Sequence, residues 1–183
     1  MKGSPMNIEY ITSLQNQITI QAVWELVKRY DHEFIPPLSA RESTSQSILT
    51  TQHGIEAEPV QYFEQLLKQE FLIALEKDKL LGFMSFNKHY VNDDLQDQLD
   101  TIYISTIIVD GDYRGKGITT RFYAALQELA KQWQKPITTR TWSTNHSHIH
   151  LLNKLQFKEI KRIKNGRGTG VDTVYYRKWL QGV

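Results

Sequence analysis

One segment near the middle of the 183-residue chain constrains its fold most, because three kinds of local structure follow one another there. The run TIYISTIIVD (101–110) is rich in β-branched residues, which favour a strand. The turn GDYRGKG (111–117) supplies glycines that adopt conformations other residues avoid. From Ile118 to Trp133, apolar residues then recur at three- and four-residue steps, as on one face of a helix. The segment therefore predicts a strand, a glycine-rich turn and a helix.

The glycine-rich turn is a candidate anion site. The first amides of a helix lack intrahelical acceptors, and the helix dipole places partial positive charge at the same end. Gly115 and Gly117 allow the main chain to approach a phosphate closely, while basic neighbours add charge and two threonines offer hydroxyls. An ordinary tight connection with solvated flanks has the same composition, so both interpretations stay open at this point. The residues concerned are Arg114, Gly115, Lys116, Gly117, Ile118, Thr119 and Thr120.

Two familiar phosphate-binding motifs do not match this turn. A P-loop needs four residues between its first glycine and Gly-Lys-Ser/Thr, whereas here the spacer is one residue short and the lysine is followed by Gly117. A dinucleotide fingerprint needs a third small residue where Thr120 stands, and an acidic residue after the next strand, where the chain reads TWSTN (141–145). A nucleotide-binding domain that uses the same turn is kept as an alternative.

The remaining pattern predicts a mixed α/β (α+β) domain. Two helices are expected first, at Ile18–Tyr30 and Pro59–Glu70, with an irregular stretch between them (31–54). A hairpin (71–91) comes before the central segment, and a strand (137–143), a short helix from Asn145 and a second hairpin (157–180) follow it. We interpret residues 1–5 (MKGSP) as a leader or a remnant of expression, and residues 6–183 as one domain.

Composition excludes several classes of function. Lys and Arg total 22 against 20 Asp and Glu, a net charge of +2 without like-charge blocks, which argues against nucleic-acid binding. No apolar run reaches the ~18 residues of a membrane span, and the N-terminus lacks the apolar stretch of a secretory signal, so we expect a cytoplasmic protein without membrane attachment. The chain has no cysteine, which excludes disulfides, thiolate metal sites and a cysteine nucleophile.

Two segments carry a resemblance to a known family. Residues 114–119 follow the pattern Arg/Gln-x-x-Gly-x-Gly/Ala, which resembles the acyl-CoA site of the GNAT superfamily of N-acetyltransferases; Thr119 departs from the usual small residue. The segment NHSHIHLLNKLQFKEI (145–160) is similar to the superfamily's Asn-x-x-Ala-x-x-Leu-Tyr-x-x-x-Gly-Phe, with His148, Leu152 and Gln156 in place of Ala, Tyr and Gly. In this order, the motifs extend the resemblance over roughly 6–180.

The resemblance implies a fold and a co-substrate. The fold is a mixed, mostly antiparallel central sheet with helices on both faces and a splayed pair of strands, and acetyl-CoA lies where those strands separate. The main chain of Ile107, Ile108 and Val109 would bind the pantetheine arm, and Asn145 would hold the arm from the opposite wall. The amides from Arg114 to Thr119 would bind the pyrophosphate. The acceptor amine, on a small molecule or a protein, would attack the thioester directly in a ternary complex.

The residues that usually transfer protons in the superfamily are absent. Ser105 and Thr106 stand where a glutamate base is common, and Leu152 stands at the tyrosine acid position. Neither a serine nor a threonine is a base near neutral pH without help. The catalytic residues are therefore unknown, and the candidates are Tyr103, on the strand face of Ser105, and His148 on the last helix. The alternative for Tyr103 is an aromatic residue that only packs in the core. The alternative for His148 is a polar helix residue at the position that is usually alanine.

Other polar groups have plainer explanations. His146 and His150 are four residues apart on the expected helix but lack a third ligand, so a solvated face is favoured and no metal is expected. The acidic stretch with Asp93, Asp94, Asp97 and Asp100 could attract a cationic amine, although a solvated turn is favoured. Acceptor-binding residues are expected in 31–47, which contains His32, Glu33, Phe34, Arg41 and Ser43. The acceptor is not disclosed, and a homodimer stays open.

Two hypotheses of different class follow. The first is an acetyl-CoA-dependent N-acetyltransferase acting on an amine. The second is a non-catalytic acyl-CoA-binding module of the same fold, which the missing acid and base make reasonable. Turnover with a panel of amines separates them, because only the enzyme releases CoA.

Overall fold

A computed structural model describes residues 6–47, 49 and 58–180 of the chain. Seven strands form one sheet in the order β1-β2-β3-β4-β5-β7-β6, antiparallel except for the parallel pair β4 and β5. The strands are β1 (Asn7–Ile11), β2 (Glu70–Glu76), β3 (Lys79–Tyr90), β4 (Thr101–Val109), β5 (Ile137–Trp142), β6 (Lys158–Ile163) and β7 (Thr173–Lys178). The helices are α1 (Gln17–Arg29), α2 (Val60–Leu66), α3 (Ile118–Trp133) and α4 (His146–Lys154), with 3₁₀ turns at Asp31–Glu33, Leu38–Ala40 and Gly111–Tyr113.

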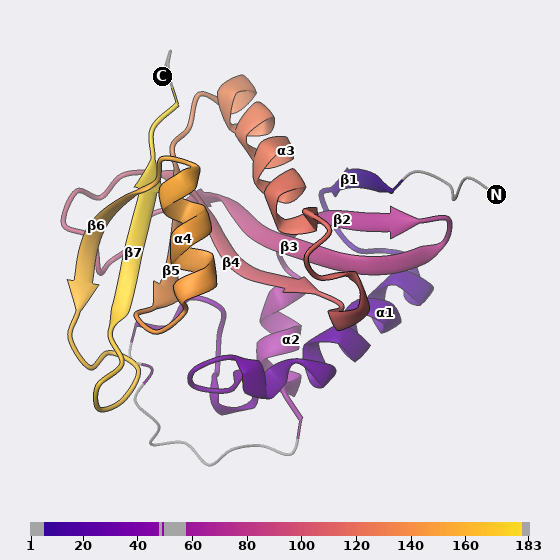
Figure 1. Ribbon diagram of the computed structural model, residues 1–183, viewed down its shortest axis with the longest axis horizontal. Helices are drawn as coiled ribbons and strands as arrows, with labels where there is room; N and C mark the ends of the chain where they lie inside the picture. The colour runs from indigo at the N-terminus through magenta and orange to yellow at the C-terminus, as the bar shows by residue number, and fades with distance from the viewer. Residues whose placement is uncertain (1–5, 48, 50–57, 181–183) are drawn as a thin grey trace.

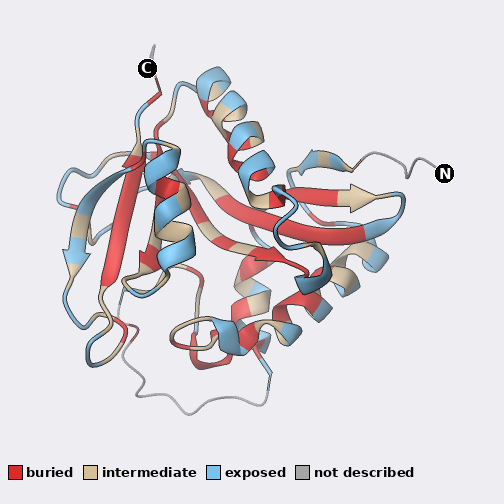
Figure 2. Cartoon of the chain, in the orientation of Figure 1, coloured by how far each residue is buried: buried red, intermediate tan, exposed pale blue. Residues whose placement is uncertain are grey.

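Helices cover both faces of the sheet, as the resemblance implied (Figure 1). Buried side chains of α3 and α4, such as Phe122 and Leu152, form one apolar cluster with one face. Val23 of α1 and Tyr62 of α2 belong to a second cluster on the opposite face. The central strands are buried, whereas the outer surfaces of α1, α3 and α4 are exposed (Figure 2). The mixed, mostly antiparallel architecture is thus confirmed.

Two features of the fold differ clearly from the predictions. The first element is a strand, because Asn7–Ile11 pairs with β2 along one edge of the sheet. Its side chains are exposed or half-buried, so it lacks the apolar signal by which a buried strand is recognised. The second helix ends at Leu66 instead of continuing to Glu70, which already pairs with Phe86 as the first residue of β2. Sheet pairing overrides helical spacing at this point.

Both predicted hairpins are present, with β2 and β3 joined at Lys77-Asp78 and β6 paired with β7. Of the described residues, none belongs to a helix with the length and apolar character needed to cross a membrane. The proposed leader at 1–5 lies outside the described residues.

Candidate active site

A cavity of about 690 Å³ lies where β4 and β5 separate. The parallel pairing of these strands stops at Ile104 and Thr139, and the residues that follow on each strand line opposite walls. The turn before α3, the start of α4 and the segment between α1 and α2 supply the other walls. The splayed pair of strands that the resemblance implied is therefore present, and it encloses a cavity.

A bulge in β4 marks the point at which the cavity begins. On β3, Ser85 pairs with Thr106 and Phe86 pairs with Ile104, so Ser105 is an extra residue in β4. A bulge bends a strand and increases its twist. Beyond it β4 pairs only with β3, and Ile107, Ile108 and Val109 line the cavity as expected.

The glycine-rich turn presents a row of unpaired main-chain amides. Gly115 and Gly117 have φ angles of 75° and 76°, a region that glycine adopts without strain. A Cβ atom at either glycine would meet nothing within 4 Å, so both face open space. Among the described residues, no hydrogen bond is found for the amides of residues 115–120. With the positive end of α3 behind them, these amides have the arrangement of the candidate anion cradle, which is the name kept for them below.

Arg114 and Lys116 take less part in the cradle than their charges suggest. The Arg114 amide donates to Gly111 O at 3.3 Å, and its guanidinium donates to both Glu33 carboxylate oxygens at 3.1 and 2.7 Å. The Lys116 ammonium lies over the Tyr113 ring, 4.5 Å from its centroid, and the residue is not part of the cavity lining. The cradle is therefore built mainly of main-chain groups.

The other predicted coenzyme residues also reach the cavity. Thr119 and Thr120 line it, and Ile118 lines it while its side chain is buried in the core. Asn145 lines the opposite wall, where it caps α4 by accepting from the His148 amide at 3.4 Å. The Asn145 side-chain amide donates to the Thr141 hydroxyl at 3.1 Å. Asn145 is thus held in place at the start of α4.

Hydroxyl groups occupy the position of the usual base. The Ser105 hydroxyl donates to Gln69 Oε1 at 2.6 Å, and Thr106 shares a hydrogen bond of 2.6 Å with the Tyr62 hydroxyl. No carboxylate belongs to this described network. At the usual acid position, Leu152 is fully buried in the core and absent from the cavity lining.

The two candidate catalytic residues lie in different surroundings. His148 lines the cavity, and its Nε2 lies 2.7 Å from the Tyr123 hydroxyl. Burial lowers the pKa of His148 to about 4, so its imidazole is neutral at pH 7. Tyr103 is 1% exposed, stacks on Tyr90 and does not line the cavity. Burial raises the pKa of Tyr103, and no partner for its hydroxyl is found among the described residues.

Three arginines line the cavity beside the bulge, and the sequence alone points to only one of them. Arg41 lies in the segment where acceptor-binding residues were expected. Arg140 follows the last residue of β5 that pairs with β4, and Arg167 comes from the turn between β6 and β7. An arginine within the otherwise uncharged run of β5 is the one signal that could have pointed to Arg140.

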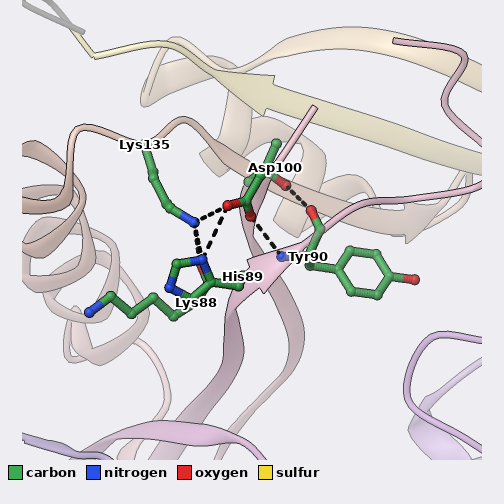
Figure 3. A network of polar contacts seen from close by, with 6 residues as sticks. Lys88, His89, Tyr90, Asp100 and Lys135 are labelled. Carbon is green, nitrogen blue, oxygen red and sulfur yellow. Dashed lines mark hydrogen bonds and ion pairs between the residues drawn. The ribbon is translucent and has the colours of Figure 1, made fainter. Parts of the chain in front are cut away.

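The carboxylates of the acidic stretch before β4 form hydrogen bonds and ion pairs with neighbouring elements, away from the cavity. Asp100 accepts from Lys135, and also from the Tyr90 amide at 3.1 Å (Figure 3). Asp97 pairs with Arg177, and Asp94 accepts from the Tyr175 hydroxyl. None of these carboxylates lines the cavity, which favours the structural interpretation over attraction of an amine.

His146 and His150 are exposed on α4. Within the described part of the chain, no group of three His, Asp or Glu side chains has an arrangement that could hold a metal ion. The absence of a metal from the reaction stays a prediction.

Comparison with known proteins agrees with this geometry. Solved structures with the same fold include an N-acetyltransferase from Staphylococcus aureus Mu50 (21% identity, TM-score 0.65, covering 97% of this chain and 100% of that one). Another is yncA from Salmonella typhimurium, solved with its cofactor acetyl-CoA (17% identity, TM-score 0.64, 97% and 95% covered). A third is the ribosomal-protein-alanine N-acetyltransferase from Brucella melitensis (16% identity, TM-score 0.65, 95% and 99% covered).

No curated protein matches the chain. The model of the acetyltransferase (GNAT) family matches residues 39–157, a range that contains the bulge of β4, the cradle and α4. The match spans well over half of the sequence. The protein therefore belongs to the GNAT family of acetyltransferases.

Proposed function

We propose that this protein is an N-acetyltransferase that moves the acetyl group of acetyl-CoA to the amine of an acceptor by direct attack. One observation carries the proposal: residues 115 and 117–120, whose amides are unpaired, line the same cavity as the unpartnered edge of β4. An anion cradle joined to a strand edge suits a long ligand with a diphosphate at one end. Family membership and neighbours solved with acetyl-CoA support the same ligand.

Each wall of the cavity has a proposed part in binding. The cradle amides bind the diphosphate, and the main chain from Ile107 to Val109 binds the pantetheine arm, with Asn145 on the opposite wall. When bound, acetyl-CoA supplies an activated acetyl thioester. We place donors for the thioester carbonyl on the β4 main chain near Ile108, where each well-aimed donor is typically worth about 3 kcal/mol. No metal is used.

Positioning accounts for much of the proposed acceleration. Two reactants held in line react as though they were at very high concentration, so an acetyltransferase can work without a strong base. His148 is our candidate for accepting the proton that the attacking amine loses and passing it to the departing thiolate, because its neutral imidazole lines the cavity and Tyr123 orients the ring. Tyr103 does not line the cavity and is the weaker candidate of the two.

A non-catalytic acyl-CoA-binding module is the second candidate function. Ser105 and Thr106 at the base position, with Leu152 at the acid position, favour this alternative. Both functions require acetyl-CoA binding, and only the first requires turnover.

The experiment measures acetyl-CoA binding by calorimetry and CoA release with a panel of amines. We expect acetyl-CoA to bind, ATP and NAD to bind far more weakly, and at least one amine to release CoA. Binding without turnover for any amine would favour the module. Stronger binding of ATP or NAD than of acetyl-CoA would instead indicate a nucleotide-binding domain.

We also propose residues 6–183 as a single domain. The N-terminal strand β1 closes one edge of the sheet, while β7, near the other end of the chain, pairs with the central strand β5. Segments from both ends of the chain thus contribute to one sheet. Limited proteolysis should release no stable smaller fragment.

A further inference from the structure

Three arginines from distant parts of the chain converge on the cavity at the bulge end. Arg41 comes from the segment between α1 and α2, Arg140 from β5 and Arg167 from the turn between β6 and β7. Arg41 and Arg167 are only 7% and 6% exposed. Such nearly complete burial of an arginine is rare without a paired anion.

All the hydrogen-bond acceptors found for these guanidiniums are neutral. Arg41 donates from Nε and Nη2 to Pro36 O at 3.1 and 2.7 Å. Arg167 donates from Nη1 to Ile35 O at 2.7 Å, and Arg140 from Nη1 to the Tyr175 hydroxyl at 3.3 Å. The buried Arg167 Nε has no acceptor at all among the described residues. The hydrogen-bonding capacity of the cluster is therefore not used up.

No carboxylate of the described chain forms an ion pair with the cluster. Asp31 contributes to the electrostatic surroundings of Arg41, but its own oxygens accept from the Ser39 amide and hydroxyl, both at 2.7 Å. Glu33 is paired with Arg114. Burial, followed by the neighbouring arginines, lowers the pKa of Arg167 to about 9, so the group stays charged at pH 7 and repels its neighbours. Buried charge of one sign is costly unless an anion offsets it.

Aromatic rings hold the guanidiniums in place. Arg41 lies 5.6 Å from the ring centroid of Phe34, and Arg167 lies 5.6 Å from that of Trp142. The Phe34 and Trp142 rings are themselves 5.9 Å apart. Planar guanidiniums that are fixed in this way suit a small oxyanion, which arginine binds through two parallel hydrogen bonds.

The cluster lies beside the middle of β4, away from the phosphate cradle. Arg140 directly follows Thr139, the last residue of β5 that pairs with β4, whereas the cradle begins beyond Val109 at the far end of that strand. Arg41 also contacts the Tyr62 ring at 5.9 Å, and the Tyr62 hydroxyl bonds to Thr106 beside the bulge. The arginines therefore lie at the end of the cavity away from the cradle, beside the same strand that carries the proposed thioester donors near Ile108.

We propose that the acceptor is a small amine that also carries an oxyanion, a carboxylate or a phosphate, which Arg41, Arg140 and Arg167 bind. This inference rests on the proposed acetyl transfer. The oxyanion of such an acceptor would pair with the buried arginines. It would also orient the amine through a group other than the reacting nitrogen. A polyamine, or any amine without an anionic group, would leave the charges of the three arginines unpaired.

The test compares matched acceptors at saturating acetyl-CoA. Amino acids are paired with their amides, phosphoethanolamine with ethanolamine, and spermidine is added as a cation. We expect kcat/KM to be at least about tenfold higher for the anionic member of a pair, and the preferred pair distinguishes carboxylate from phosphate. Equal or better turnover of amides, ethanolamine or spermidine overturns the proposal. So does the absence of both turnover and calorimetric binding for every anionic amine.

Substitutions of Arg167 test whether the preference for anionic amines depends on the arginine cluster. Arg167→Gln should raise KM for the preferred anionic amine about tenfold or more, and Arg167→Lys should restore part of the loss because it keeps the charge without the fork. Lys158→Gln removes an exposed charge on β6 and should change nothing. Unchanged acetyl-CoA affinity in Arg167→Gln shows that the variant folds. If acetyl-CoA fails to bind the wild type, the proposed function fails; if it binds and KM is unmoved in Arg167→Gln, only the acceptor inference fails.

Discussion

The two ends of the cavity are built by different means. The cradle end uses main-chain amides from a single continuous segment, residues 115–120. The bulge end uses side chains such as Arg41, Arg140 and Arg167, which are far apart in the sequence and meet only in the folded chain. In the proposed function the main-chain groups bind the diphosphate that every acyl-CoA shares, whereas the side chains at the other end can be exchanged without altering the fold. We infer that the first end serves the common co-substrate and the second end the individual acceptor.

The largest effect is expected from Gly117→Asp at the cradle end. Gly117 has a φ angle of 76° and faces open space, so an aspartate would strain the turn and place a negative charge where a phosphate approaches. Like charges about 4 Å apart near a protein surface cost about 4 kcal/mol. Acetyl-CoA affinity, measured by calorimetry, should fall on the order of a thousandfold.

Gly170→Asp is the matched control for that substitution. Gly170 has a φ angle of 80°, faces open space and lies outside the cavity lining, so it reproduces the backbone strain without the phosphate. Its acetyl-CoA affinity should stay at the wild-type value. If Gly117→Asp left acetyl-CoA affinity unchanged, the phosphates would not bind at the cradle. The contrast between the two ends of the cavity would then be wrong.

A smaller effect is expected on the stability of the protein, which should depend on pH through the protonation of His148. Its pKa is lowered to about 4 in the folded protein from 6.5, so between these values the unfolded chain binds more protons. The contribution of His148 to stability is therefore complete above pH 6.5 and is lost as the pH falls to 4. The loss amounts to at most about 3 kcal/mol.

His148→Gln should remove this part of the acid sensitivity, as measured by chemical unfolding from pH 4 to 7. His146→Gln is the matched control, because His146 is an exposed histidine on the same helix. If the acid sensitivity of His148→Gln equals that of the wild type, the imidazole is not held neutral by burial. Its proposed part in proton transfer would then lose its basis.

The cradle end could be predicted from the sequence because the residues that form it are contiguous in the chain. A β-branched run, two glycines and a helical apolar spacing lie within residues 101–133, and each element acts on its immediate neighbours. The bulge at Ser105 follows from pairing with β3, and the edge strand β1 follows from pairing with β2, so neither leaves a strong local pattern. Sheet faces and edges are decided by such long-range partners.

The bulge end could not be predicted for the same physical reason. Arginine is usually exposed, and nothing in the turn that contains Arg167 indicates that its side chain is buried. Its burial depends on Trp142 and on the carbonyl of Ile35, residues that are distant in the sequence. Of the arginines in the cluster, Arg41 alone fell within a segment where acceptor residues were expected.

The smallest effect concerns a side chain at the cradle end. Glu33 holds the Arg114 guanidinium through two hydrogen bonds, but both side chains are about half exposed, so the pair contributes at most about 1 kcal/mol to stability. Glu33→Gln removes a negative charge near the cradle, while Arg114 keeps its Nε hydrogen bond to Val109 O at 3.0 Å, so acetyl-CoA affinity should rise by no more than about fivefold. Arg114→Gln should lower it by a similarly small factor, because amides and not side chains bind the phosphates. A hundredfold loss in Arg114→Gln would mean that the cradle end also depends on a side chain, and the distinction between the two ends would fail.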